Sequence, residues 1–162
     1  MKYKNKISFH LIIIMLIVAT LAAASYKRNI VWQDDFTLWS DVIEKSLNKA
    51  RGYNNRGNIY LRKHQYYMAF EDYSRAIEIN PNYIEAYNNM GVAYSQIGQY
   101  DMAINAYYKA VAINPDYALT YFNRGLAFLN KGQNDKALFD FRKACEMGHE
   151  MGCKFLQFLH SN

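Results

Sequence analysis

The sequence has few of the residues that catalytic and metal-binding sites usually need. Its 162 residues include only 2 cysteines and 4 histidines, and the histidines are scattered along the chain. No nucleophile elbow, phosphate-binding glycine loop or paired-histidine metal motif is present. We therefore expect no enzymatic activity, no metal or other cofactor, and no small-molecule substrate.

A concentrated basic surface is also missing. The formal net charge is +5, but five of the 19 lysines and arginines lie within residues 1–28, which contain no acid. The remaining 14 cations are balanced by the 14 aspartates and glutamates. Because duplex binding usually requires clustered positive charge, we expect no nucleic-acid partner.

The N-terminal basic residues flank an apolar run, Ile7–Ala24, of 18 residues. At about 1.5 Å per residue, this length just spans a hydrocarbon core of about 30 Å. Residues 1–28 therefore predict a signal anchor or transmembrane helix. A cleaved signal peptide is the alternative, because Leu11–Ala19 has the length of an h-region and Ala22–Ala24 supplies an A-x-A pattern. The excess of lysines before the run favours export of residues 29–162, either anchored on the periplasmic or extracytoplasmic side or secreted.

The most informative feature is a repeat with a fixed period of 34 residues. The sequence "YNNRGNIY" at residues 53–60 recurs as "YNNMGVAY" at 87–94 and as "YFNRGLAF" at 121–128. A period of this length indicates stacked supersecondary units. The three units are 50–83, 84–117 and 118–151.

Within each unit, small and aromatic residues recur at spacings of four and three, which places them on one face of a helix. In the first unit these residues are Tyr53, Gly57 and Tyr60, followed by Ala69, Tyr73 and Ala76. Gly98 and Gly132 stand where a first helix turns into a second, and Pro81 and Pro115 follow the second helix. The pattern predicts three helix hairpins.

These residues resemble the tetratricopeptide repeat (TPR) family at nearly every signature position over residues 50–151. The resemblance implies an all-α solenoid that binds other proteins. The chain departs from the family pattern at His64, which replaces a loop glycine, and at His149, which replaces the last proline. Arg56 and Arg124 stand where leucine is usual, and we interpret both as structural.

Two flanking segments complete the predicted α-solenoid. Residues 29–49 read as a degenerate half-repeat with a helix over Asp34–Ser46. Residues 150–162 contain a helix over Glu150–His160, which would cap the exposed apolar face of the third unit. The expected architecture is therefore three TPR hairpins between a half-repeat and a capping helix, preceded by a transmembrane helix.

The two cysteines are Cys145 and Cys153, on either side of the turn before the capping helix. The passage "KACEMGHEMGC" resembles the cysteine-bearing junction of secreted Sel1-like repeat proteins, in which such a pair is bridged. The resemblance implies a disulfide that pins the cap, and two buried thiols are the alternative. Together with His149 and His160, the cysteines do not show a recognisable zinc spacing.

An asparagine recurs at the sixth position of each unit. In stacked TPR units this stripe of the first helix lines the concave surface, so the resemblance implies a row of carboxamides that hold the backbone of an extended peptide. The predicted peptide-binding residues are Asn55, Asn89, Asn123, Asn58, Arg62, Gln96 and Asn130. The alternative is that these asparagines serve local helix hydrogen bonds.

We therefore expect a non-enzymatic, membrane-anchored module that binds a peptide segment of a protein partner. A structural or assembly subunit of a bacterial envelope complex is a second interpretation. A third is an accessory of a polytopic glycosyltransferase-like membrane protein, because "VWQDDFTLWSDVIEKS" is similar to the join between the last span and the TPR tail of such proteins.

Overall fold

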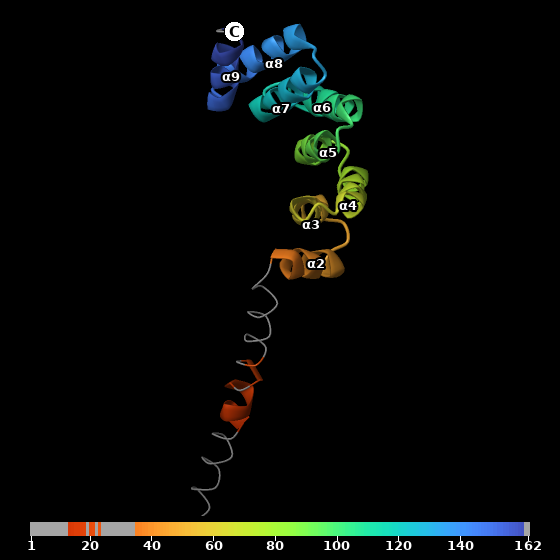
Figure 1. Ribbon diagram of the computed structural model, residues 1–162. Coiled ribbons are helices and arrows are strands. Elements are labelled where there is room, and N and C mark those ends of the chain that lie inside the picture. Colours follow the sequence, from red (N-terminus) through yellow and green to blue (C-terminus); the bar gives the residue numbers. More distant parts are fainter. Residues whose placement is uncertain (1–12, 19, 22, 24–34, 161–162) are drawn as a thin grey trace, which may run out of the picture.

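All regular secondary structure in the described part of the chain is helical. The computed structural model describes residues 13–18, 20–21, 23 and 35–160 (Figure 1). From residue 35 onward the helices are α2 (Asp35–Lys45), α3 (Ala50–Arg62), α4 (Tyr66–Ile79), α5 (Ile84–Gln96), α6 (Tyr100–Ile113), α7 (Ala118–Asn130), α8 (Asn134–Glu146) and α9 (Glu150–His160).

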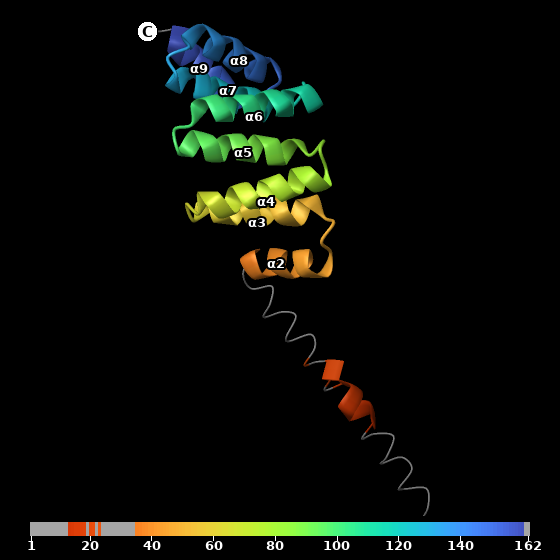
Figure 2. The ribbon, with the colours of Figure 1, turned by 90° about the vertical axis from the view of Figure 1, so that its right-hand side faces the viewer.

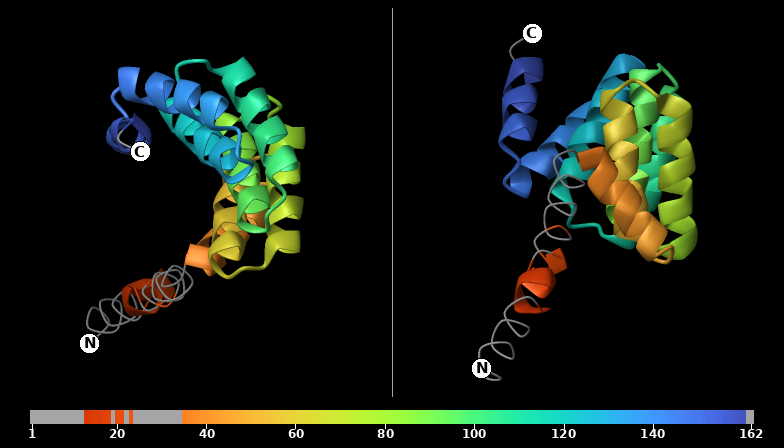
Figure 3. Two further views of the ribbon diagram at one scale, coloured as in Figure 1. Left: turned by 45° about the horizontal axis from the view of Figure 1, so that its top comes forward. Right: turned by 90° about the horizontal axis from the view of Figure 1, so that it is seen from below.

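The helices stack as a solenoid. Helices α3 and α4, α5 and α6, and α7 and α8 pack as hairpins, and each hairpin packs on the next. Helices α2 to α6 lie one above another like layers (Figure 2). Helices α3, α5 and α7 occupy one side of the array and α4 and α6 the other (Figure 1), and the array bends towards the α3, α5 and α7 side (Figure 3). The predicted all-α, TPR-like solenoid is confirmed.

Each hairpin is closed by a glycine that lies against an aromatic ring. A Cβ atom added to Gly57 would lie 2.7 Å from the Tyr73 ring, and one added to Gly125 would lie 2.7 Å from the Phe141 ring. Tyr73 and Phe141 are fully buried. The 34-residue recurrence of glycine and aromatic residues thus marks the point of closest helix approach in each unit.

The turns inside the hairpins use left-handed backbone. Gly98 and Gly132 have φ angles of 75° and 71°, and His64 takes the same place in the first hairpin with a φ of 56°. Histidine therefore adopts a conformation that suits glycine better. The departure from the family pattern at His64 changes the residue but leaves the turn unchanged.

Both ends of the solenoid are covered by additional helices. At the start, α2 places Ile43 against Gly52, where an added Cβ would lie 3.1 Å from the isoleucine side chain. At the end, α9 places Phe155 against Phe122, with ring centroids 5.6 Å apart. The observed bounds of α2 and α9 lie within one residue of the predicted helices.

The residue that replaces the last proline has a role at the start of α9. His149 Nδ1 accepts a hydrogen bond of 3.2 Å from the Gly152 backbone N–H, and the His149 ring lies 4.6 Å from the Phe122 ring. An N–H of the first turn of a helix has no partner within that helix, so this contact satisfies one of the open donors of α9.

Within the described residues, none of the helices combines the length and apolarity required to cross a membrane. The predicted span, residues 7–24, lies outside the described residues except for 13–18, 20–21 and 23. The predicted half-repeat is described from residue 35 onward.

Candidate functional site

The candidate site is the inner face, which we define as the second, sixth, ninth and thirteenth positions of α3, α5 and α7. Spacings of four, three and four keep these positions on one side of each helix. The inner face contains all seven predicted peptide-binding residues. These three helices are on the side towards which the array bends (Figure 3).

The repeated asparagines connect neighbouring hairpins. Asn89 donates from Nδ2 to Asn54 Oδ1 over 3.0 Å, and Asn123 donates from Nδ2 to Asn88 Oδ1 over 3.1 Å. Both acceptors are buried, with 4% of Asn54 and 3% of Asn88 exposed. The sixth-position amide of one unit thus pairs with the fifth-position amide of the preceding unit. These hydrogen bonds are not local to a helix, because they join residues 35 apart in the sequence.

The contact between the third hairpin and the cap uses different residue types. Phe122 replaces the fifth-position asparagine in the third unit, and its ring packs on Phe155 of α9. An aromatic pair thus takes the place of an amide pair where the final helix covers the array. The amide pairs are therefore contacts that the sequence uses between successive hairpins.

Of the remaining predicted residues, two accept hydrogen bonds from other side chains and three are exposed to solvent. In the first unit, Asn55 Oδ1 accepts from Asn54 at 3.4 Å and Asn58 Oδ1 accepts from the Tyr73 hydroxyl at 2.8 Å. Arg62, Gln96 and Asn130 are exposed, and Asn130 donates from Nδ2 to the Leu126 carbonyl oxygen of its own helix over 2.9 Å.

The exposed part of the inner face differs in chemistry between its two ends. Arg51 and Arg62 provide cations at the α3 end, and Arg62 lies 3.7 Å from Asp35. Leu119, at the α7 end, is 37% exposed. The face therefore offers charge and amides to one end of a bound chain and apolar surface to the other.

Two ion pairs, one buried and one partly buried, were not predicted. Arg56 donates from Nε and Nη2 to both carboxylate oxygens of Asp72, at 2.8 and 2.7 Å, and Arg124 does the same with Asp140 at the same distances. Each pair joins the two helices of one hairpin, which supports the structural interpretation of both arginines. Burial raises the pKa of the Asp140 carboxyl group, and the hydrogen bonds and charge of Arg124 oppose that rise.

A comparison of the three repeat units within this sequence would have indicated these pairs. The second unit has Met90 where the others have arginine and Ala106 where they have aspartate. The two positions thus change together, from a charged pair to an apolar pair. This covariation between units of one chain indicates contact between the seventh and twenty-third positions.

Cys145 and Cys153 are joined by a disulfide, with their Cα atoms 4.6 Å apart. The bond connects the last turn of α8 to the first turn of α9. Beside it, a Cβ added to Gly152 would lie 2.9 Å from the Ala144 Cβ, so the two helices are in close contact at this point. The bridge fixes the cap where it crosses α8.

Comparison with family models gives two matches, each described as tetratricopeptide repeat. One covers residues 48–116 and the other residues 106–139. Together they span more than half of the chain. No curated protein matches the sequence.

Solved structures of similar fold include two crystal structures of MamA. They are 29% and 30% identical to this chain, with TM-scores of 0.64 and 0.62. The matches cover 72% and 74% of this chain, which spans 68% and 65% of the MamA chains. A third structure is the second TPR of Spaghetti (RPAP3) bound to the HSP90 peptide SRMEEVD. It is 25% identical, with a TM-score of 0.59, and the match covers 61% of this chain and 92% of that one.

Proposed function

Because the chain belongs to the tetratricopeptide repeat family, we propose that it is a protein-interaction module that binds an extended segment of a partner along its inner face. The observation that carries the proposal is the row of oriented amides on three successive hairpins. The TPR of Spaghetti provides a parallel, since that domain is solved with a bound peptide. Binding rather than catalysis is also typical of this family and fold.

Oriented amides suit this role because their conformations are fixed before a ligand arrives. Asn89 and Asn123 each use one N–H to bond the preceding hairpin, at 3.0 and 3.1 Å. Each amide keeps its own Oδ1 and a second N–H for the backbone of a bound peptide. A side chain that is already held loses less conformational entropy on binding, which favours affinity.

Side chains beyond the amides would then set the preference for a sequence. Arg51 and Arg62 at the α3 end favour an acidic residue in the ligand, and Leu119 at the α7 end favours an apolar one. The proposed ligand is therefore an extended segment with acidic residues at one end and apolar residues at the other. Because only three hairpins contribute, we expect modest affinity.

Site-specific photocrosslinking tests this proposal without damage to the scaffold. A benzoylphenylalanine at Gln96 or Leu119 should capture a partner protein from intact membranes, because both positions are exposed on the inner face. The matched control is the same group at Ser74, an exposed position on the outer helix α4. Capture from Ser74 alone, or from none of the three sites, would contradict binding on the inner face.

A structural or assembly role is the second candidate. The observation that favours it is the set of exposed aromatic side chains on α4, α6 and α8, which includes Tyr67, Tyr108 and Phe139. Self-association in sedimentation experiments that responds to changes at these residues, with no capture from Gln96, would favour an assembly subunit. Co-purification with a polytopic glycosyltransferase-like protein would favour the accessory role.

We further propose that residues 7–24 anchor the protein in the membrane, with the repeats on the extracytoplasmic side. Two observations support this. Residues 13–18 are helical and their large apolar side chains are exposed, which favours a nonaqueous surrounding. The disulfide suits an oxidising compartment.

Membrane fractionation with mass measurement tests the anchor. The full-length mass in the membrane fraction is expected, and protease added outside the membrane should digest the repeats. A soluble product that begins near Ser25 would show that a cleaved signal peptide, rather than an anchor, is correct.

A further inference from the structure

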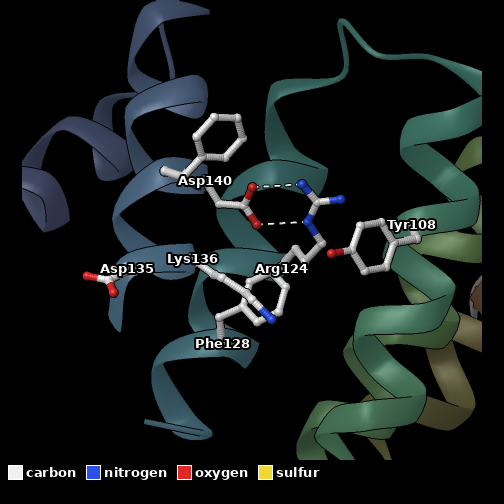
Figure 4. Close-up of a pocket in the computed structure, with 7 residues that line it drawn as sticks. Tyr108, Arg124, Phe128, Asp135, Lys136 and Asp140 are labelled. Carbon is white, nitrogen blue, oxygen red and sulfur yellow. Dashed lines mark hydrogen bonds and ion pairs between the residues drawn. The ribbon is translucent and has the colours of Figure 1, made fainter. Parts of the chain in front are cut away.

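A pocket of about 330 Å³ lies at the junction of the second and third hairpins. Side chains from α6, α7 and α8 line it (Figure 4). Phe128 in this pocket is about 140° around α7 from Asn123, at about 100° per residue. The pocket is therefore on another side of α7 than the inner face.

The back of the pocket is a buried, neutral ion pair. Arg124 donates two hydrogen bonds to Asp140, and the exposed fractions of the two side chains are 7% and 1%. The Tyr108 ring covers the guanidinium group, with its centroid 4.5 Å from the guanidinium carbon. Because the charges of the pair cancel, the pair contributes rigidity and donor groups but no net charge.

The rim combines exposed aromatic rings with one cation. Tyr108 is 52% exposed and Phe139 is 56% exposed. Lys136 Nζ lies 5.4 Å from the centroid of the Phe128 ring, and Lys136 forms no ion pair with an acidic residue in the described part of the chain. The Asp135 side chain points away from the other lining residues (Figure 4). Outside the ion pair, Lys136 is therefore the charged lining residue that points towards the other lining side chains, while Asp135 carries the opposite charge and points away from them.

The first hairpin repeats the ion pair as Arg56 and Asp72 but has Met68 in the place of Lys136, so the combination of the pair with a lysine occurs only in the third hairpin. The residues 34 positions before Arg124, Lys136 and Asp140 are Met90, Met102 and Ala106, so apolar side chains replace the polar ones. The pocket is thus a feature of this junction and not a consequence of the repeat.

We propose that the pocket is a second docking site, which takes a large apolar side chain next to a carboxylate on a partner protein. The apolar side chain would lie between the exposed rings of Tyr108 and Phe139, and the carboxylate would pair with Lys136. Charge complementarity selects this ligand, because Lys136 is the charged lining side chain outside the ion pair that points towards the aromatic rings (Figure 4). Aromatic residues and arginine in a preformed pocket are also the residue types that contribute most to protein–protein binding.

A labelled peptide and two variants test the proposal on the full chain. The probe is fluorescein-labelled Gly-Ser-Glu-Phe-Glu-Ser-Gly, with fluorescence anisotropy as the measurement and an expected Kd of about 0.1 mM. Replacement of Phe by Ser, or of both Glu by Gln, in the probe should weaken binding. Lys136→Glu and Phe139→Ser in the protein should each weaken it by about fivefold or more.

The matched control is Lys109→Glu, which makes the same charge change at an exposed residue of α6 that does not line the pocket and should change the Kd by less than about twofold. Circular dichroism and urea midpoints verify that each variant is folded.

No binding of the probe, or an equal loss with Lys109→Glu, would overturn the proposal. So would self-association of the protein through Phe139 without probe binding, because the occupant would then be a second copy. Capture by a photocrosslinker at Gln96 should be unchanged in Lys136→Glu, which separates this site from the inner face.

Discussion

The buried pair of Arg124 and Asp140 gives the sharpest test of how this solenoid is stabilised. Arg124→Met alone would leave the Asp140 carboxylate, whose side chain is 1% exposed, without its partner. Loss of one partner of a buried ion pair costs about 3–5 kcal/mol. Protonation of the carboxyl group limits this cost, because protonating an aspartate with the ordinary pKa of the unfolded chain, about 4, requires about 4 kcal/mol at pH 7. We therefore expect Arg124→Met to lower the free energy of unfolding by about 3–4 kcal/mol.

The second hairpin already contains the apolar alternative, Met90 with Ala106. The double variant Arg124→Met/Asp140→Ala copies that solution into the third hairpin. It should recover most of the loss and come within about 1 kcal/mol of the parent, because no buried charge remains and methionine adapts to irregular spaces. The expected coupling between the two sites is then about 2–3 kcal/mol.

Urea denaturation followed by circular dichroism measures these differences. With a slope of about 2 kcal/mol per molar, the Arg124→Met midpoint should fall by about 2 M. Arg56→Met is the control, and it should cost less because the Arg56 side chain is 23% exposed and water can screen the charge of Asp72. A double variant as unstable as Arg124→Met would refute the reasoning, because the loss could not then come from an unpaired charge.

Three further predictions concern the third hairpin, the cap and the buried Tyr107. Gly125→Ala should cost about 1–3 kcal/mol in urea denaturation, because its Cβ would lie 2.7 Å from the buried Phe141 ring, and no loss would contradict the close approach. Cys153→Ser should lower the free energy of unfolding by about 2 kcal/mol, because it removes the disulfide to Cys145, which lies 8 residues away in the sequence. Reduction of the disulfide in the parent protein should lower the free energy of unfolding by the same amount. Burial raises the pKa of Tyr107 to about 12, so its contribution to stability is complete below pH 10 and is lost as the pH rises from about 10 to 12. Unfolding titrations should show a smaller alkaline loss in Tyr107→Phe, and an identical pH profile would exclude this tyrosine as a cause.

The amide pairs change how the repeated asparagines should be tested. Asn89→Ala would remove a possible ligand contact, but it would also leave the buried Asn54 Oδ1 without its donor. An unsatisfied buried acceptor costs about 1–3 kcal/mol, so lower ligand capture by this variant could follow from lost stability. Exposed positions such as Gln96 and Leu119 separate binding from stability, which is the reason for their use in the crosslinking experiment.

The sequence alone was sufficient for the helices and their order. The 34-residue period, the glycine and aromatic spacing and the turn residues predict three hairpins, and the structure places the helices where these signals indicate. This works because each unit of a solenoid packs only on its neighbours, so local patterns decide nearly all of the architecture. The replacement of glycine by His64 did not disturb this prediction, since the turn geometry is set by the helices on both sides.

The partners of the polar side chains were decided only by the tertiary structure. A helical spacing shows which face a residue occupies, but it does not show which atoms of a neighbouring helix come within 3 Å of it. Asn89 reaches Asn54 because the rotation between successive hairpins places the sixth position of one against the fifth of the other. The pocket beside Lys136 likewise exists because Arg124 bonds to Asp140 within its own hairpin while Tyr108 approaches from the preceding one. Sequence periodicity therefore determined the scaffold, and the packing angles between its helices determined which side chains remain available to a partner.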